Sequence, residues 1–137
     1  MTIGTGADQA VRKVSTSSAP SAIGPYSQAV IASPYLFISG QLPIDPATGE
    51  LDNSTITGQT KRIFANLKGI LGAAGLDIED VVKTTVFLTD LADFAEVNDA
   101  YAEQFTGDVL PARSTVQVAA LPRGANVEVE AIAFRSS

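Results

Sequence analysis

The hydrophobic positions of the chain fall into short β-prone runs and two longer stretches with helical spacing. The short runs are each predicted to form a strand: residues 28–32, 35–40, 81–88, 114–119 and 127–134. Ser33-Pro34 separates the first two, which are expected to form a hairpin. Strict alternation in 81–88 predicts a common face for Val82, Thr84, Val86 and Leu88.

Residues 57–74 are predicted to form the first helix, and Gly75 is a stop signal. Its apolar stripe consists of Ile63, Leu67, Ile70, Leu71 and Ala74. Gly69 and Gly72 each weaken a helix by about 1 kcal/mol relative to alanine, which predicts that this helix packs closely on a sheet.

The second helix is expected to begin at Asp93, with Glu96 completing a capping box, and to end before Gly107. The order of elements is then strand, strand, helix, strand, helix, strand, strand. This order predicts an α+β fold with a mixed sheet and two helices on one face. The other face needs a cover, and a symmetric homo-oligomer is the simplest one.

Length and composition predict one domain at residues 20–137, preceded by a flexible lead-in at residues 1–19. The 45% apolar content excludes a disordered-protein composition. No apolar run approaches the roughly 18 residues of a membrane span, and the N-terminus has no signal-peptide core. The expected location is the cytoplasm, with no membrane partner.

The chain has no cysteine and no histidine, which excludes thiolate nucleophiles, imidazole bases and the metal sites built from them. A metal would need carboxylates alone, which suits hard cations, and we expect no metal and no cofactor. The net charge of −6, without a basic cluster to offset it, speaks against a nucleic-acid partner.

Two charged residues stand out because they lie in β-prone segments. Arg113 directly precedes one predicted strand, and a guanidinium can hold a carboxylate through two parallel hydrogen bonds. Glu128 and Glu130 share one face of another strand. Each also has an ordinary interpretation, as a paired surface arginine and as solvated acids. A low-dielectric cleft would instead raise a carboxyl pKa and allow one acid to handle a water proton.

Three further polar sites are weaker candidates. Tyr26 follows the Gly24-Pro25 turn, where its phenol suits hydrogen bonding or stacking, or it is a half-buried turn aromatic. Ser39 and Gly40 end a predicted strand and offer a hydroxyl and accessible backbone, or a simple strand exit. Asn98 on the second helix is suited to orienting a loop or a ligand, although exposed helix asparagines are common.

Taken together, these segments resemble the RidA/YjgF family of reactive intermediate deaminases, formerly described as L-PSP translation inhibitors. The likeness runs from about Pro20 to Phe134. The matching stretches are Ile23–Gln28, Ile38–Pro43, Asp45–Glu50, Asn66–Leu76, Val82–Leu91, Phe94–Asn98, Pro111–Ser114, Leu121-Pro122 and Val127–Ala131.

The resemblance implies a chorismate-mutase-like fold, assembled as a homotrimer with ligand clefts between subunits. It implies hydrolysis of 2-aminoacrylate, 2-iminopropanoate and 2-iminobutanoate to 2-ketoacids and ammonia without cofactor or metal. Arg113 matches the family arginine that grips the substrate carboxylate, and Glu128 matches the glutamate that handles the water. The family frame also suggests a substrate-binding set of Arg113, Tyr26, Ser39, Gly40 and Thr115.

Two other functions stay open at this point. One is a non-catalytic or regulatory trimer that binds small carboxylates in the same clefts. The other is a ribonuclease or translation inhibitor, which the charge, the missing histidine and the lack of a basic patch disfavour.

Overall fold

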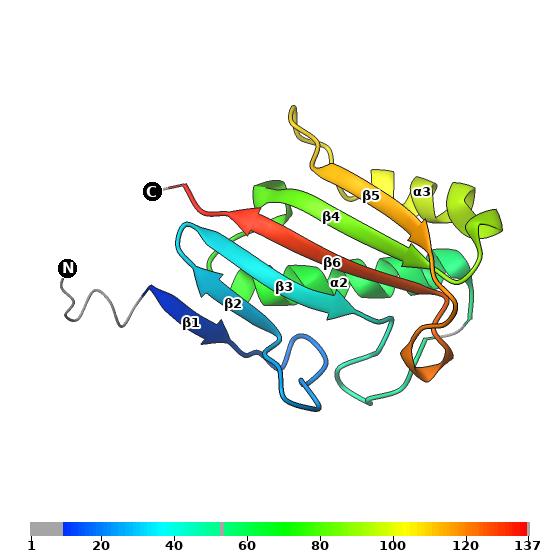
Figure 1. The fold of residues 1–137 in the computed structure, drawn as a ribbon, viewed down its shortest axis with the longest axis horizontal. Helices are drawn as coiled ribbons and strands as arrows, with labels where there is room; N and C mark the ends of the chain where they lie inside the picture. Colours follow the sequence, from blue (N-terminus) through cyan, green and yellow to red (C-terminus); the bar gives the residue numbers. More distant parts are fainter. Residues whose placement is uncertain (1–9, 53, 137) are drawn as a thin grey trace.

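The computed structural model describes residues 10–52 and 54–136. One mixed sheet of six strands has the order β1-β2-β3-β6-β4-β5, in which only β4 and β5 run parallel. The helices α2 and α3 lie behind this sheet in Figure 1, which confirms the predicted α+β architecture. The strands are β1 Val11–Val14, β2 Ala29–Ala32, β3 Tyr35–Gln41, β4 Val81–Leu88, β5 Ala112–Gln117 and β6 Val127–Phe134. The helices are α2 Ile56–Ala73 and α3 Phe94–Ala102, with short 3₁₀ turns at Ile78–Asp80, Leu91–Asp93 and Pro122–Gly124.

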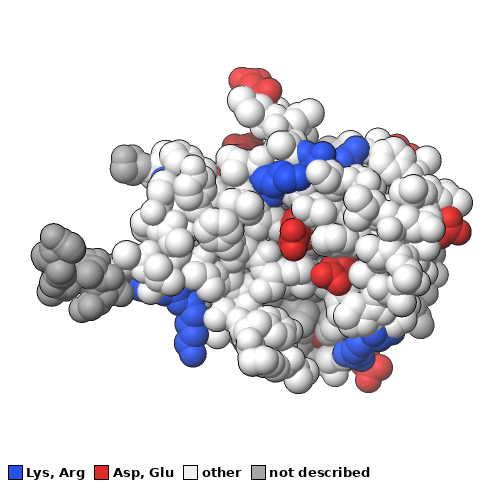
Figure 2. Space-filling view, viewed as in Figure 1, with Lys and Arg blue, Asp and Glu red and all other residues white. Residues whose placement is uncertain are grey.

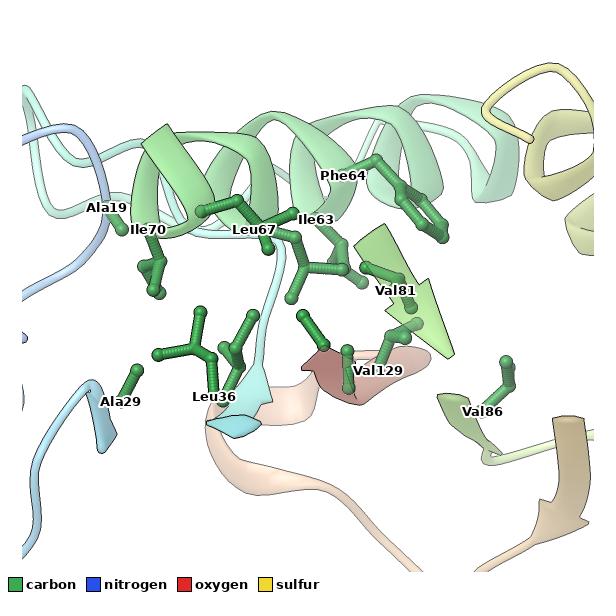
Figure 3. Close-up of a cluster of buried hydrophobic side chains, with 14 of the residues drawn as sticks. Ala19, Ala29, Leu36, Ile63, Phe64, Leu67, Ile70, Val81, Val86 and Val129 are labelled. Atoms are coloured by element: carbon green, nitrogen blue, oxygen red, sulfur yellow. The ribbon is translucent and has the colours of Figure 1, made fainter. Parts of the chain in front are cut away.

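The core lies between α2 and the sheet. In Figure 3 the side chains of Ile63, Leu67 and Ile70 point from α2 toward those of Leu36 and Val129. The predicted apolar stripe of the helix is therefore confirmed. Burying one such aliphatic side chain contributes about 1.5–3 kcal/mol relative to leaving it exposed.

Strand β4 departs from strict alternation at its start. The pairing with β6 shifts between Val81 and Lys83, as in a β-bulge. Val81 is buried, whereas Val82 is 44% exposed although Thr84 is buried. The predicted common face of Val82 and Thr84 is therefore wrong, because the extra residue in the strand turns the chain locally.

The predicted capping box of the second helix is also wrong. The Asp93 side chain makes no capping hydrogen bond. Asp90 caps instead, since its carboxylate accepts a hydrogen bond from the Ala92 backbone N–H at 2.9 Å and starts a 3₁₀ turn that leads into α3. Because the 3₁₀ turn precedes α3, the residue that caps it, Asp90, lies three residues before the expected cap, Asp93.

Of the two glycines of α2, one is closely packed, but its neighbour is not the predicted sheet. A Cβ on Gly69 would lie 2.5 Å from the Ser18 carbonyl oxygen, so the helix contacts the N-terminal segment there and not the sheet. A Cβ on Gly72 would meet nothing within 4 Å.

The predicted flexible lead-in over residues 1–19 is wrong for the part that the structure describes, because residues 10–19 include a paired strand and a buried side chain. Residues 1–9 lie outside the described part, but Val11–Val14 form β1 and pair with β2. Ala19 is 2% exposed. The buried Gln28 holds this segment: its Nε2 donates to the carbonyls of Thr16 and Pro20 at 3.0 and 2.7 Å. The hydrogen bonds of the Gln28 side chain to this segment (here called the Gln28 clamp) join residues far apart in the sequence. The local hydrophobic pattern therefore could not predict them.

We expect Gln28→Ala to lower the free energy of unfolding by about 2–4 kcal/mol, because it leaves the buried Ala19 carbonyl and the partly buried carbonyls of Thr16 and Pro20 without this donor. Chemical denaturation measures this change. Gln104→Ala is the matched control, since that amide makes one long hydrogen bond of 3.5 Å, to the Ala100 carbonyl of the adjacent helix α3. Similar losses in both variants would contradict the clamp.

No helix in residues 10–52 and 54–136 has the length and apolar character needed to cross a bilayer.

Candidate active site

The guanidinium of Arg113 is held in a fixed position by α3. Nη1 donates to Asn98 Oδ1 at 2.8 Å. The guanidinium carbon lies 4.7 Å from the ring centre of Tyr101 and 5.5 Å from that of Phe94. These cation–π contacts and one hydrogen bond leave other N–H donors of the guanidinium available for a planar anion.

The ring of Tyr101, on which the Arg113 guanidinium stacks, is itself held in place. Its hydroxyl is 2.7 Å from the Thr84 hydroxyl, and both side chains are buried. Burial raises the pKa of Tyr101, against the opposing effects of the Thr84 hydrogen bond and the Arg113 charge. The neutral phenol therefore holds the ring in place, and a cavity of about 450 Å³ opens beside Arg113, lined also by Phe105 and Leu110.

Glu128 lies on the other side of the sheet in a half-buried position. Burial, and then the charge of Glu130, raise the pKa of the Glu128 carboxyl. The carboxylate lies against Gly40: a Cβ there would be 2.8 Å from Glu128 Cδ and would overlap its Oε2. Gly40 is therefore required by the position of this acid, which is a stronger constraint than a strand exit.

Ser39 and Tyr26 lie near Gly40. The Ser39 hydroxyl donates to the Ser27 carbonyl at 2.6 Å and so ties the Tyr26 loop to β3. The Tyr26 hydroxyl accepts a hydrogen bond from the Ile23 N–H at 3.3 Å, and the side chain is 54% exposed. Tyr26 and Gly40 line one recess, and Gly40 lies against Glu128, so we treat these residues and Ser39 as one group, the Glu128 cluster.

Within one chain, Arg113 and Glu128 point to opposite faces of the sheet. Arg113 is in register with Thr84, which is buried under α3, and Thr115 follows on the same face. Glu128 is in register with Phe87 on the face without helices. The structure therefore divides the predicted residues into two groups: Arg113 with Thr115 and Asn98, and Glu128 with Gly40, Ser39 and Tyr26.

The open face of the sheet is mostly uncharged, with two acidic groups near its middle (Figure 2). Glu128 and Glu130 are the acids of β6 on this face. Tyr35, Phe37 and Phe134 lie beside one another and are 40–44% exposed. Exposed aromatic clusters of this kind mark interaction surfaces.

The sequence interpretation missed the aromatic support of Arg113. Phe94 and Tyr101 were not among its candidate site residues. Their spacing around Asn98, four residues and then three, places all three on one helix face and was an available signal. Among the described residues, no group of three or more acidic side chains could hold a metal ion.

A family model described as endoribonuclease L-PSP matches residues 16–135. The chain belongs to this family, the RidA/YjgF family. A RidA-family relative from Mus musculus, named 2-iminobutanoate/2-iminopropanoate deaminase, is 53% identical over 126 residues, covering 91% of this chain and 93% of the relative. Protein DfrA of Myxococcus xanthus is 53% identical over 124 residues, covering 89% and 94%.

Solved RidA-family structures agree with the fold. The crystal structure of Escherichia coli TdcF with bound serine has a TM-score of 0.85 and 45% identity, and the match covers 91% of this chain and 99% of that one. Since relatives of similar identity carry different names, family membership establishes the fold and leaves the specific activity to be tested.

Proposed function

We propose that this chain hydrolyses small 2-imino acids and their enamine tautomers, such as 2-aminoacrylate, 2-iminopropanoate and 2-iminobutanoate, in the cytoplasm. The products are the 2-ketoacid and ammonia, and the reaction uses neither cofactor nor metal. The supporting observation is the pair of a fixed guanidinium at Arg113 and a half-buried carboxyl of raised pKa at Glu128. The 53% identity to a relative named 2-iminobutanoate/2-iminopropanoate deaminase also supports this function.

In the proposed mechanism, Arg113 binds the substrate carboxylate through two parallel hydrogen bonds. Glu128 takes a proton from a water molecule, whose oxygen bonds to the imine carbon. Glu128 then gives this proton to the former imine nitrogen, which completes the carbinolamine. Glu128 next takes the hydroxyl proton of the carbinolamine and passes it to nitrogen, so that the C–N bond breaks, ammonia leaves and the carbonyl forms. Backbone groups near Thr115 help to hold the water, and Tyr26, Ser39 and Gly40 line the cleft. A raised carboxyl pKa suits this exchange near neutral pH.

The reaction requires two copies of the chain. Arg113 and Glu128 lie on opposite faces, so one copy cannot bring both to the same substrate. β5 is an edge strand, so its Arg113 can approach the open face of a neighbour, where Glu128 lies (Figure 1). A homotrimer with three such clefts would also cover the exposed aromatic residues.

The test is an assay with a threonine or serine dehydratase that releases the imine, with semicarbazide added to trap it. We expect this protein to speed ketoacid formation and to reduce the trapped fraction. Ketoacid formation at the spontaneous rate would reject the proposal.

Glu128 predicts a particular dependence on pH. The acid limb of kcat/KM should lie above the ordinary glutamate value of 4.5, because the protonated acid cannot accept a proton from water. Glu130→Gln should shift this limb to lower pH by removing the neighbouring charge. An acid limb at the same pH in Glu130→Gln and in the wild type would show that the charge of Glu130 does not raise the pKa of Glu128.

The same pKa shift predicts that Glu128→Gln is more thermally stable than the wild type at neutral pH. Burial disfavours the ionised form, so wild-type stability falls as the pH rises above 4.5 through the raised value. The difference in melting temperature should vanish at pH values below 4.5, where the acid is protonated in both folded and unfolded states.

Gly40→Ala is expected to lower kcat/KM about a hundredfold, because the new Cβ displaces the Glu128 carboxylate and a misplacement of this size is costly. Gly72→Ala is the control, since that position has open space and should keep full activity. Full activity of Gly40→Ala would remove Glu128 from its proposed place.

A second candidate is a trimer that binds small carboxylates without turnover. The fixed guanidinium of Arg113 would serve binding alone, and the TdcF crystal structure contains serine, which is itself a small carboxylate. Calorimetric binding of a 2-ketoacid together with a null result in the imine assay would favour it.

A further inference from the structure

A separate recess adjoins the Glu128 cluster on the side of the Tyr26 loop. It has a volume of about 270 Å³ and is lined by Tyr26 and Gly40, by apolar side chains, by the polar side chains of Ser21, Gln28 and Gln41, and by a single charged side chain. The apolar walls include Ile23, Leu42 and Ile44, and the charged residue is Arg123. Neither the sequence motifs nor the proposed mechanism uses Arg123.

Arg123 is tethered at this position. Its Nη1 and Nη2 both donate to the Gly49 carbonyl at 3.2 Å, so the two hydrogen bonds go to backbone and neither goes to a carboxylate. Its backbone has φ of 62°, in the left-handed region that side-chain-bearing residues rarely adopt. A guanidinium has five N–H donors, so three of them remain for another acceptor.

The recess lies beside the proposed reacting carbon. Gly40 lines it and also contacts Glu128. An imine carbon carries nitrogen, a carboxylate and a side chain. If Arg113 of a neighbouring copy holds the carboxylate and Glu128 serves the water, the side chain is the part that remains to enter this recess.

We infer that the recess binds the substrate side chain and that Arg123 selects 2-imino acids whose side chain ends in a second carboxylate; this rests on the proposed deaminase function. The apolar walls suit methylene groups, and the guanidinium at one side suits the terminal anion. A purely apolar side chain of the same length would offer no acceptor to the exposed guanidinium of Arg123.

The test compares acidic and neutral imines with purified full-length protein. L-Glutamate and L-aspartate oxidases with catalase supply 2-iminoglutarate and 2-iminosuccinate, and an alanine-oxidising enzyme supplies 2-iminopropanoate. We expect the wild type to hydrolyse the acidic imines. Arg123→Gln should lower kcat/KM for them about tenfold or more, mainly through KM, and change that for 2-iminopropanoate less than about twofold.

Two further variants guard the interpretation. Arg123→Gly should show the same selective loss while its melting temperature is kept or raised, because glycine adopts a φ of 62° without strain. Arg12→Gln removes an exposed positive charge on β1, outside the recess, and should leave both classes of imine unaffected.

The outcomes separate this inference from the function on which it rests. A wild type that hydrolyses 2-iminopropanoate and leaves both acidic imines at their spontaneous rates overturns the inference while the deaminase function stands. Equal losses for acidic and neutral imines in Arg123→Gln, or a matching loss in Arg12→Gln, also overturn it. No hydrolysis of any imine rejects the deaminase function and the inference together.

Discussion

Two inactive variants, Arg113→Ala and Glu128→Gln, are expected to recover about one quarter of the wild-type activity when they are unfolded and refolded together. Each cleft is proposed to take Arg113 from one copy and Glu128 from its neighbour, because the two side chains leave opposite faces of the sheet. In an equal mixture of the two variants, the subunit that provides Arg113 to a given cleft has an intact arginine with a probability of about one half. The neighbouring subunit that provides Glu128 has an intact glutamate with the same probability. About one quarter of the clefts in such a cyclic assembly with heterologous contacts therefore have both residues intact.

The matched control mixes wild type with the double variant Arg113→Ala/Glu128→Gln. Physical mixing without exchange should leave half of the wild-type activity. Refolding together should reduce it to about one quarter, since both copies at a cleft must then be wild type. Hetero-oligomers, verified by two affinity tags, that recover no activity from the single variants would show that the cleft is not shared in this way.

Arg113→Lys should reduce kcat/KM about a hundredfold or more, although the charge is kept. Lysine cannot form two parallel hydrogen bonds to a carboxylate, and its compact ammonium loses the planar contact with the rings of Tyr101 and Phe94. Steady-state kinetics with 2-iminopropanoate measure the change. The far-ultraviolet circular dichroism spectrum should be unaltered, because the side chain lies at the surface.

Arg12→Lys, on the exposed edge of β1, is the control for this substitution and should retain full activity. Near wild-type turnover in Arg113→Lys would mean that charge alone suffices and that bidentate geometry has no role. Equal ketoacid release by the wild type and Arg113→Ala would remove Arg113 from catalysis altogether.

Local patterns were reliable where one residue type repeats over several turns. The stripe from Ile63 to Ala74 and the alternation in residues 127–134 correspond to α2 and β6, because these elements each bury one continuous face. Apart from the cap of the second helix, the errors came where a long-range partner decides the outcome. β1 exists through pairing with β2 and the clamp at Gln28, and the bulge at Val82 exists through pairing with β6.

The sequence by itself determined both helices, five of the six strands, the layer architecture and the residue types available for chemistry. It marked Arg113 and Glu128 as charges in unusual places, but it did not determine whether they face each other. Only the tertiary structure decided that, since β4 lies between β5 and β6 and sets the register of both. Successive side chains in a strand point to opposite faces, so a register difference of one residue decides whether two groups can share a site within one chain.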